Sequence, residues 1–184
     1  MVLGIDTATP YLSLALVDEA GLSVASFCER VERDHAKRVL PELDMLLKRA
    51  GVSKPQLTGV GAGVGPGSYT GLRVGLATAK GLAAALGLPV RGGSTLAAIA
   101  AQSLGLGERG AAALDARRGN VYAAVFERTD AGLVMLSEPA KVALDDLRTE
   151  QPGLPLFLDE PPDAAYLAQA FLEHGPGELR GLYL

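Results

Sequence analysis

Three polar residues, Asp6, Thr7 and Asp115, are the candidates for a catalytic or ligand-binding role in this sequence. Asp6 and Thr7 directly follow the short apolar run VLGI, and Asp115 follows the apolar run AAAL. Carboxylates at strand ends can hold a hydrated magnesium ion and orient nucleotide phosphates. An aspartate that opens a turn after a strand is an equally common reason for the same pattern. Asp6, Thr7 and Asp115 are therefore candidates for a vestigial nucleotide cleft, with a plain turn as the competing explanation.

The stretch GVGPGSYTGLRVG, residues 63–75, is rich in glycine and leads into an alanine-rich run. It is not a P-loop, because no Gly-Lys-Ser or Gly-Lys-Thr follows and Lys80 comes after an alanine. The dinucleotide pattern G-x-G-x-x-G also fails, because Thr70 occupies the place of the third glycine. A helix that begins here can be capped by Ser68 or Thr70, and its free amides can attract an anion. The pattern favours a tight strand-to-helix turn over direct phosphate binding.

The helix that follows has a face almost free of side chains, since Gly71, Gly75 and Ala79 recur every fourth residue. A glycine inside a helix costs about 1 kcal/mol relative to alanine. Close approach of another helix or backbone is the best explanation for keeping such residues. The approaching element is either internal, such as a helix predicted over residues 35–50, or part of another chain, and both alternatives remain open.

Histidine and cysteine chemistry has little support in this sequence. His35 and His174 are the only histidines, and Val39 stands where a helical metal pair would need a second one. Ser68 has no adjacent histidine that would support nucleophilic catalysis. Cys28 is the single cysteine, which excludes a disulfide framework within the chain and suits a reducing compartment.

Composition narrows the class of protein further. The chain has 184 residues, 48% of them hydrophobic, and a net charge of −4. That charge argues against a protein that binds nucleic acid alone, so any nucleic acid would be shared with a partner. The N-terminus has no basic segment, and nowhere do about 18 uncharged apolar residues run together, as a membrane span requires. We expect a cytoplasmic protein with one compact domain or two small lobes.

Hydrophobic periodicity predicts the elements that must position these residues. Residues 2–28 are expected to form three strands joined by tight turns. Residues 35–50, whose apolar positions include Leu40, are expected to form an amphipathic helix with Gly51 as its C-cap. Pro41 lies inside this helix, so the helix either starts later or has a kinked first turn. Strands in LTGVGAGVG and PVRGGST then alternate with the glycine-flanked helix and a helix in STLAAIAAQSL. This order is that of a ribonuclease H-like lobe in the actin and sugar-kinase superfamily.

The second half of the chain repeats the pattern of the first. LDARRGNVYAAVFERTDAGL matches IDTATPYLSLALVDEAGL with a period of about 110 residues, which aligns Asp115 with Asp6. A helix near 141–150, a strand in LPLFL and a helix near 163–174 are expected to follow.

The repeat predicts an α/β protein with an N-terminal lobe over residues 1–108 and a reduced C-terminal lobe over residues 109–184. In such a duplicated fold, Asp6 and Asp115 are expected to face each other across the cleft between the lobes.

Six segments carry a resemblance to a known family: GIDTAT, RDHAKRVLP, GVGPGSYTGLRVGLATAKGLA, STLAAIA, DARRGNVYAAVF and the terminal LYL. Together they resemble the bacterial TsaB family, also called YeaZ, over essentially the whole chain, and the long glycine motif is highly specific. The resemblance implies an actin-like (ASKHA) fold of two ribonuclease H-like lobes. It also implies a role in forming N6-threonylcarbamoyladenosine beside the anticodon of tRNAs that read codons beginning with A.

The resemblance further implies a non-catalytic partner of TsaD, the paralogue that transfers the threonylcarbamoyl group from its adenylate to tRNA. TsaD-like enzymes carry a two-histidine metal motif at the position of RDHAKRV, where this chain has only His35. In the family, the helix with this motif and the helix after the glycine loop pair with TsaD or, in its absence, with a second copy. The interface implied for this chain comprises His35, Arg38, Tyr69, Gly71, Leu72, Gly75 and Ala79.

No cofactor of the chain's own and no membrane contact are implied. ATP and a metal ion are expected only in the complex with TsaD and a further ATPase component, TsaE, and tRNA is expected to be met through that complex. The chain departs from the family in being shorter than most relatives, with a distal lobe trimmed around residues 150–165. The main alternative is an autonomous ATP-dependent phosphotransferase of the actin and sugar-kinase superfamily that uses Asp6 and Asp115. A plain homodimeric interaction module is a further alternative.

Overall fold

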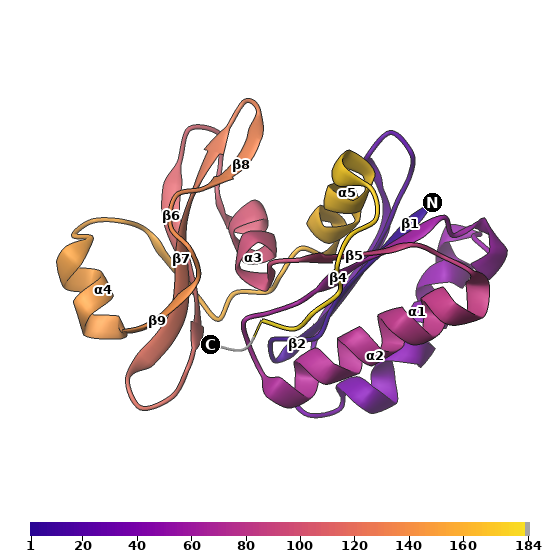
Figure 1. The fold of residues 1–184 in the computed structure, drawn as a ribbon, viewed down its shortest axis with the longest axis horizontal. Coiled ribbons are helices and arrows are strands. Elements are labelled where there is room, and N and C mark those ends of the chain that lie inside the picture. The colour runs from indigo at the N-terminus through magenta and orange to yellow at the C-terminus, as the bar shows by residue number, and fades with distance from the viewer. Residues whose placement is uncertain (183–184) are drawn as a thin grey trace.

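Two β-sheets organise the chain in the computed structural model, which describes residues 1–182 (Figure 1). The first sheet has the order β3-β2-β1-β4-β5 and contains β1 (Val2–Asp6), β2 (Tyr11–Val17), β3 (Ser23–Arg30), β4 (Gly59–Gly63) and β5 (Val90–Gly93). The second has the order β10-β6-β7-β8 and contains β6 (Arg109–Asp115), β7 (Asn120–Thr129), β8 (Gly132–Met135) and β10 (Leu156–Leu158), with β9 (Ala140–Ala143) also paired to β7. The helices are α1 (His35–Ala50), the 3-10 turn η1 (Lys54–Gln56), α2 (Tyr69–Leu86), α3 (Thr95–Ser103), α4 (Leu144–Glu150) and α5 (Ala164–His174).

The two sheets share one connectivity. Strand β1 pairs antiparallel with β2 and parallel with β4, and strand β6 pairs antiparallel with β7 and parallel with β10. Four strands of each sheet thus correspond, β1 to β6, β2 to β7, β3 to β8 and β4 to β10, in the order expected of duplicated ribonuclease H-like lobes. The predicted α/β, actin-like fold is confirmed, and among the described residues the second sheet has no counterpart of β5.

The helices and sheets form layers (Figure 1). Helices α1 and α2 cover the outer face of the first sheet, and α5 covers its inner face. Helix α3 packs between α5 and the second sheet, whose outer side carries α4. Helix α3 therefore packs on the sheet of the second half, and α5 on the sheet of the first half. The division into residues 1–108 and 109–184 stays a prediction, because each half contributes a helix to the other half's sheet.

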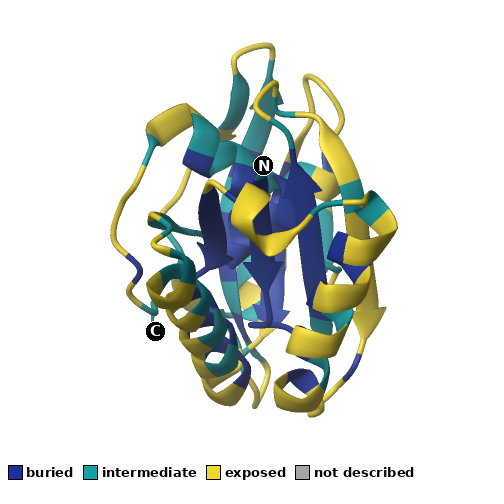
Figure 2. Ribbon diagram, turned by 90° about the vertical axis from the view of Figure 1, so that its right-hand side faces the viewer, coloured by how far each residue is buried: buried dark blue, intermediate teal, exposed yellow. Residues whose placement is uncertain are grey.

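Alternation along the strands of the first sheet builds a core on both of its faces. On the outer face, Leu3 and Ile5 of β1 pack in one cluster with Leu43 of α1. On the inner face, Val2 packs in another cluster with Phe171 of α5. Figure 2 shows the central strands in dark blue beneath helices whose outward surfaces are yellow, that is, exposed. Each fully buried leucine or isoleucine contributes about 1.5–3 kcal/mol through the hydrophobic effect.

Helix α1 follows the predicted span, with Gly51 in the left-handed conformation (φ 66°) as its C-cap. The helix starts at His35 and includes Pro41. Of the two alternatives given for Pro41, a start after the proline is therefore wrong. A proline nitrogen leaves the carbonyl four residues earlier, here that of Lys37, without its helical partner. Both residues are exposed, so water can satisfy that carbonyl group.

The prediction of a helix from about residue 141 is wrong at its start. Residues Ala140–Ala143 instead form β9, in which Val142 lies opposite Val121 of β7, and α4 begins at Leu144. Pairing with an existing strand thus determines the conformation of this segment, which local propensity alone did not indicate.

The glycine face of α2 packs against the turn that follows β1. A Cβ atom at Gly71 would lie 2.1 Å from the carbonyl oxygen of Thr7, and one at Gly75 would lie 2.4 Å from Thr7 Oγ1. The Thr7 hydroxyl donates a 2.7 Å hydrogen bond to the Gly71 carbonyl, and the Ser68 amide donates one of 2.7 Å to the carbonyl of Ala8. The element that approaches the two glycines is therefore the turn after β1 of the same chain, through the backbone of Thr7 at Gly71 and its side chain at Gly75.

This contact predicts opposite effects for two alanine substitutions in one helix. We expect Gly71→Ala to lower the free energy of unfolding by about 1–3 kcal/mol, because the new methyl group would displace the Thr7 carbonyl. Gly81→Ala is the matched control, since no atom lies within 4 Å of the new methyl group. It should raise the free energy of unfolding by up to about 1 kcal/mol through helix propensity. Urea unfolding followed by circular dichroism measures both values, and equal stabilisation by the two substitutions would contradict the contact.

Candidate functional site

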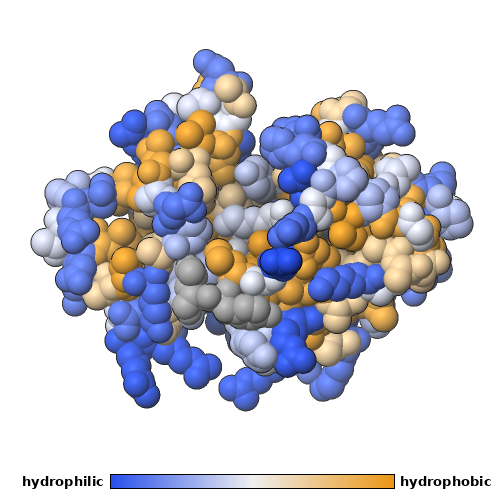
Figure 3. Space-filling model, viewed as in Figure 1, coloured by the Kyte–Doolittle hydropathy of each residue, from blue (hydrophilic) through white to orange (hydrophobic). Residues whose placement is uncertain are grey.

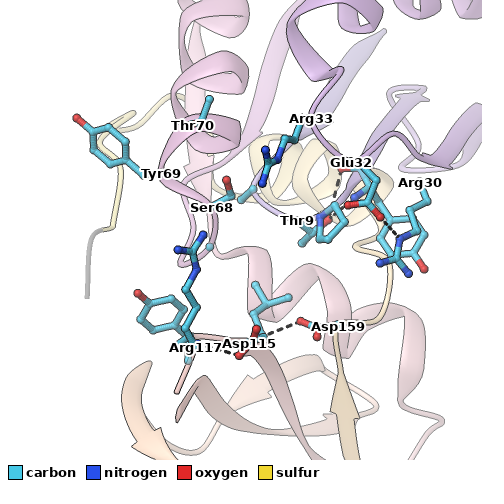
Figure 4. A pocket seen from close by; sticks show the side chains of 17 residues that line it. Thr9, Arg30, Glu32, Arg33, Ser68, Tyr69, Thr70, Asp115, Arg117 and Asp159 are labelled. Carbon is cyan, nitrogen blue, oxygen red and sulfur yellow. Dashed lines mark hydrogen bonds and ion pairs between the residues drawn. The ribbon is translucent and has the colours of Figure 1, made fainter. Parts of the chain in front are cut away.

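A cleft of about 670 Å³ opens where the turns after β1 and β6 approach each other (Figure 4). Its walls come from both halves of the chain, and its volume lies in the range of small-molecule sites. The residues labelled in Figure 4 are Thr9, Arg30, Glu32, Arg33, Ser68, Tyr69, Thr70, Asp115, Arg117 and Asp159.

Asp6 does not line this cleft. Its side chain is fully buried, where Oδ1 accepts a 2.8 Å hydrogen bond from the Ala8 amide and Oδ2 accepts one of 2.8 Å from the Thr95 hydroxyl. A Cβ atom at Gly63 would lie 1.9 Å from Oδ2, so the adjacent strand β4 closes over the carboxyl group. Burial raises the pKa of Asp6 to about 6, against the lowering effect of these two hydrogen bonds. The expectation that Asp6 and Asp115 face each other across the cleft is therefore wrong.

Asp115 is exposed and lies in the cleft wall. Its Oδ1 accepts a 2.8 Å hydrogen bond from the amide of Arg117, two residues on, as Asp6 Oδ1 does from Ala8. The two aspartates therefore make the same turn in the two lobes, as the competing explanation expected. The Asp115 amide also donates a 2.9 Å hydrogen bond to Oδ1 of Asp159.

Thr7 and His35 are both buried and used inside the fold. The Thr7 hydroxyl is bonded to the Gly71 carbonyl, and His35 Nε2 lies 3.1 Å from the carbonyl oxygen of Tyr11. Because a carbonyl only accepts, Nε2 is the protonated nitrogen in this contact. Neither side chain reaches the cleft.

The implied partner interface divides into buried and accessible residues. His35 and the α2 residues Gly71, Leu72, Gly75 and Ala79 are all buried in this chain and offer little exposed surface to a partner, so their place in an interface stays a prediction. Within the chain, these α2 residues pack on Thr7 and in the core.

Arg38 and Tyr69 remain accessible. Arg38 is held by a bidentate pair with Glu29 at 2.7 and 2.8 Å and by Glu42 at 2.5 Å, and Tyr69 is 60% exposed. Sequence reasoning missed the exposure of Met45 and counted Leu40 with the core of α1, although the two are 45% and 52% exposed.

Residues 1–182 show neither a metal-binding cluster nor a membrane-spanning helix. In this part of the chain no group of three or more His, Cys, Asp or Glu side chains is arranged to hold a metal ion. Among the same residues, no helix has the length and apolar character needed to cross a membrane. The motif residues Tyr183 and Leu184 lie outside the described residues.

The buried carboxyl group predicts a distinct pH dependence of stability. Folded Asp6 keeps its proton up to about pH 6, whereas the unfolded chain loses it near pH 3.8, so the native state binds more protons between these values. The free energy of unfolding therefore falls as pH rises through this window, by about 3 kcal/mol from this group. Asp6→Asn removes the effect, so we expect its stability relative to wild type to increase between pH 4 and pH 7.

Urea unfolding of wild type and variant across this pH range measures the difference. Asp115→Asn, which changes the same turn contact at an exposed position, reports the contribution of that contact alone. A stability difference between Asp6→Asn and wild type that does not vary with pH would contradict the account.

The chain is similar to known proteins of one family. The model of the family described as TsaD, tRNA N6-adenosine threonylcarbamoyltransferase, matches residues 27–155. The tRNA threonylcarbamoyladenosine biosynthesis protein TsaB of Escherichia coli is 39% identical over 134 residues, which are 72% of this chain and 57% of that protein. The chain spans between 51% and 63% of the length of the first three curated relatives that it matches.

Solved structures agree over the full length of this chain. YeaZ from Pseudomonas aeruginosa is 30% identical with a TM-score of 0.84, covering 100% of this chain and 99% of that one. A second structure, described as an uncharacterized protein with similarity to peptidase YeaZ from Pseudomonas aeruginosa, is 29% identical with a TM-score of 0.86, covering 100% of this chain and 98% of that one. The fold, the repeat and these likenesses agree, and the chain belongs to the TsaB family, also called YeaZ.

Proposed function

We propose that this chain is a non-catalytic, cytoplasmic subunit in the biosynthesis of N6-threonylcarbamoyladenosine in tRNA, acting as the partner of TsaD. Membership of a family whose curated members are named for this biosynthesis is the observation that carries the proposal. As a partner, the chain would bind TsaD as a heterodimer and would form a homodimer alone. TsaE, ATP and a metal ion would bind only in the larger complex. The chain would contact tRNA only as part of that complex.

The use of potentially reactive side chains inside the fold supports a non-catalytic role. Asp6, Thr7 and His35 are each buried and hydrogen-bonded to other parts of the chain. A phosphotransferase that used Asp6 and Asp115 would need both carboxylates at the substrate, and Asp6 does not line the cleft. These contacts favour the subunit over the autonomous enzyme.

The outward faces of α1 and α2 are the surface that we assign to the partner. They expose Leu40 and Met45 on α1 and Tyr69 at the start of α2. Large apolar side chains of this kind supply much of the binding energy at protein interfaces, and tyrosine is enriched among the residues that dominate it. In the view of Figure 3, apolar side chains in orange and charged ones in blue are mixed over the helices of the right-hand lobe, as at a non-obligate interface.

Arg38 sits at the edge of this surface in a fixed orientation, because two carboxylates hold its guanidinium group. A fixed side chain loses little conformational entropy when a partner packs against it. Tyr69 belongs both to this face and to the lining of the cleft. A partner bound to this face would therefore cover only the part of the cleft next to Tyr69.

Charge reversal on the helix face tests the proposal. We expect the wild-type chain and TsaD of the same organism to elute together as a heterodimer in size-exclusion chromatography with light scattering. Leu40→Glu should weaken this pairing at least tenfold, because it would bury an unpaired charge at the interface. The exposed position of Leu40 predicts an unchanged free energy of unfolding.

Leu106→Glu is the matched control, since Leu106 is 68% exposed between α3 and β6, away from α1 and α2. It should pair with TsaD as the wild type does. Equal loss of pairing in both variants would reject the assigned face, and a wild-type chain that never binds TsaD would reject the partner role.

A further inference from the structure

We propose that the free edge of β8 binds an extended segment of another protein, with apolar residues in its middle and a basic residue at each end. The segment would add a strand to the second sheet. This inference goes beyond the proposed function, because it concerns the second lobe and not the outward faces of α1 and α2.

Strand β8 ends the second sheet, near the top of that sheet in Figure 1. It pairs with β7, and no strand among residues 1–182 lies on its other side. The amide of Leu136, directly after β8, donates a 2.7 Å hydrogen bond to the Val125 carbonyl of β7. Successive residues of a strand direct their backbone groups to opposite sides, so the amide and carbonyl groups of Met135 point away from β7. A further strand can form hydrogen bonds with these groups.

Large apolar side chains are exposed on both faces of the sheet at this edge. Val134, Met135 and Leu136 are consecutive and are 43%, 44% and 44% exposed. Val134 lies opposite Glu127 and Met135 opposite Phe126, so the two side chains project from opposite faces. A helix packed on one face would cover only one of them. A strand added along the edge would shield both, because its own side chains continue each face.

Two acidic residues flank this edge and define the charge of the added segment. Asp130 precedes β8, Glu138 follows it, and both are exposed. Neither side chain makes a hydrogen bond or ion pair within residues 1–182, whereas Glu127 of β7 is paired with Arg109 at 3.0 Å. Opposite charges that face each other across a strand pair stabilise it. A lysine or arginine at each end of the segment would therefore meet a free carboxylate.

The same two charges disfavour a second copy of this chain as the added strand. Two copies of β8 would pair antiparallel about a two-fold axis. Asp130 and Glu138 lie four residues before and four residues after Val134. A pair centred on Val134 would thus place Asp130 of each copy opposite Glu138 of the other, and like charges in this position destabilise a sheet. We therefore assign the edge to a segment of a different protein.

Fluorescence anisotropy of labelled peptides titrated with the full chain tests the proposal. The probe is the peptide Lys-Thr-Val-Thr-Val-Thr-Val-Thr-Lys, which has one residue for each position from Asp130 to Glu138. The control peptide has glutamate in place of both lysines. We expect the lysine peptide to bind at least tenfold more tightly, because its two ends are attracted where those of the control are repelled.

Charge reversal in the chain gives the matched comparison. Asp130→Lys combined with Glu138→Lys should reverse the preference, so that the glutamate peptide binds more tightly. Glu19→Lys combined with Glu150→Lys makes the same change in net charge at exposed positions outside β8 and its flanking residues. This control variant should keep the preference for the lysine peptide.

Met135→Pro tests the backbone contribution. Proline has no amide hydrogen to donate, and an edge strand accepts it on the side away from its neighbour. Binding of the lysine peptide should weaken at least tenfold, the effect of losing a backbone hydrogen bond to the added strand. The thermal midpoint should change little. If this variant fails to fold, the charge reversal decides the question.

Four results would overturn the proposal. They are binding of neither peptide at millimolar concentration, equal binding of both, a wild-type preference in the Asp130→Lys, Glu138→Lys variant, and full binding by folded Met135→Pro. Self-association of the wild-type chain that Met135→Pro abolishes would also overturn it, in favour of a second copy. The titrations contain no TsaD, so their failure leaves the pairing with TsaD a separate result.

Discussion

The close contact between α2 and Thr7 is the constraint on which the rest of the structure depends. Because Gly71 and Gly75 carry no side chain, the helix lies directly on the turn after β1. The Gly71 carbonyl of the helix accepts a hydrogen bond from the Thr7 hydroxyl. This fixes the start of α2, and with it Ser68 and one wall of the cleft. It also turns the opposite face of the helix outward, beside α1, where a partner can reach it.

The duplication supplies two equivalent turns with different roles. Each first strand ends in an aspartate that accepts the amide two residues later, at 2.8 Å in both lobes. In the first lobe, Gly63 and Thr95 close over Asp6, and the turn becomes part of the core. In the second lobe Asp115 stays exposed and positions Arg117. The turn of the first lobe is therefore packed in the core beneath α2, and the turn of the second lobe lines the cleft.

Local patterns in the sequence predicted most of the elements, since strands and helices follow from periodicity and caps. The three-strand meander, the helix ended by Gly51 and the repeat near Asp115 depend on neighbours in the chain. The burial of Asp6 depends on Thr95, 89 residues away, and the direction of the glycine face depends on Thr7, 64 residues from Gly71. Such contacts leave no periodic signal in the sequence. The spacing of Gly71, Gly75 and Ala79 is therefore the same whether the helix packs against its own chain or against another one.

Hydrogen exchange followed by mass spectrometry, on the chain alone and mixed with TsaD of the same organism, tests the central claim most directly. The account predicts slower exchange in peptides of α1 and of the first turns of α2 when TsaD is present, with little change in β6 to β10. Slower exchange confined to the second sheet, or a stable complex with no change in α1 and α2, would contradict it.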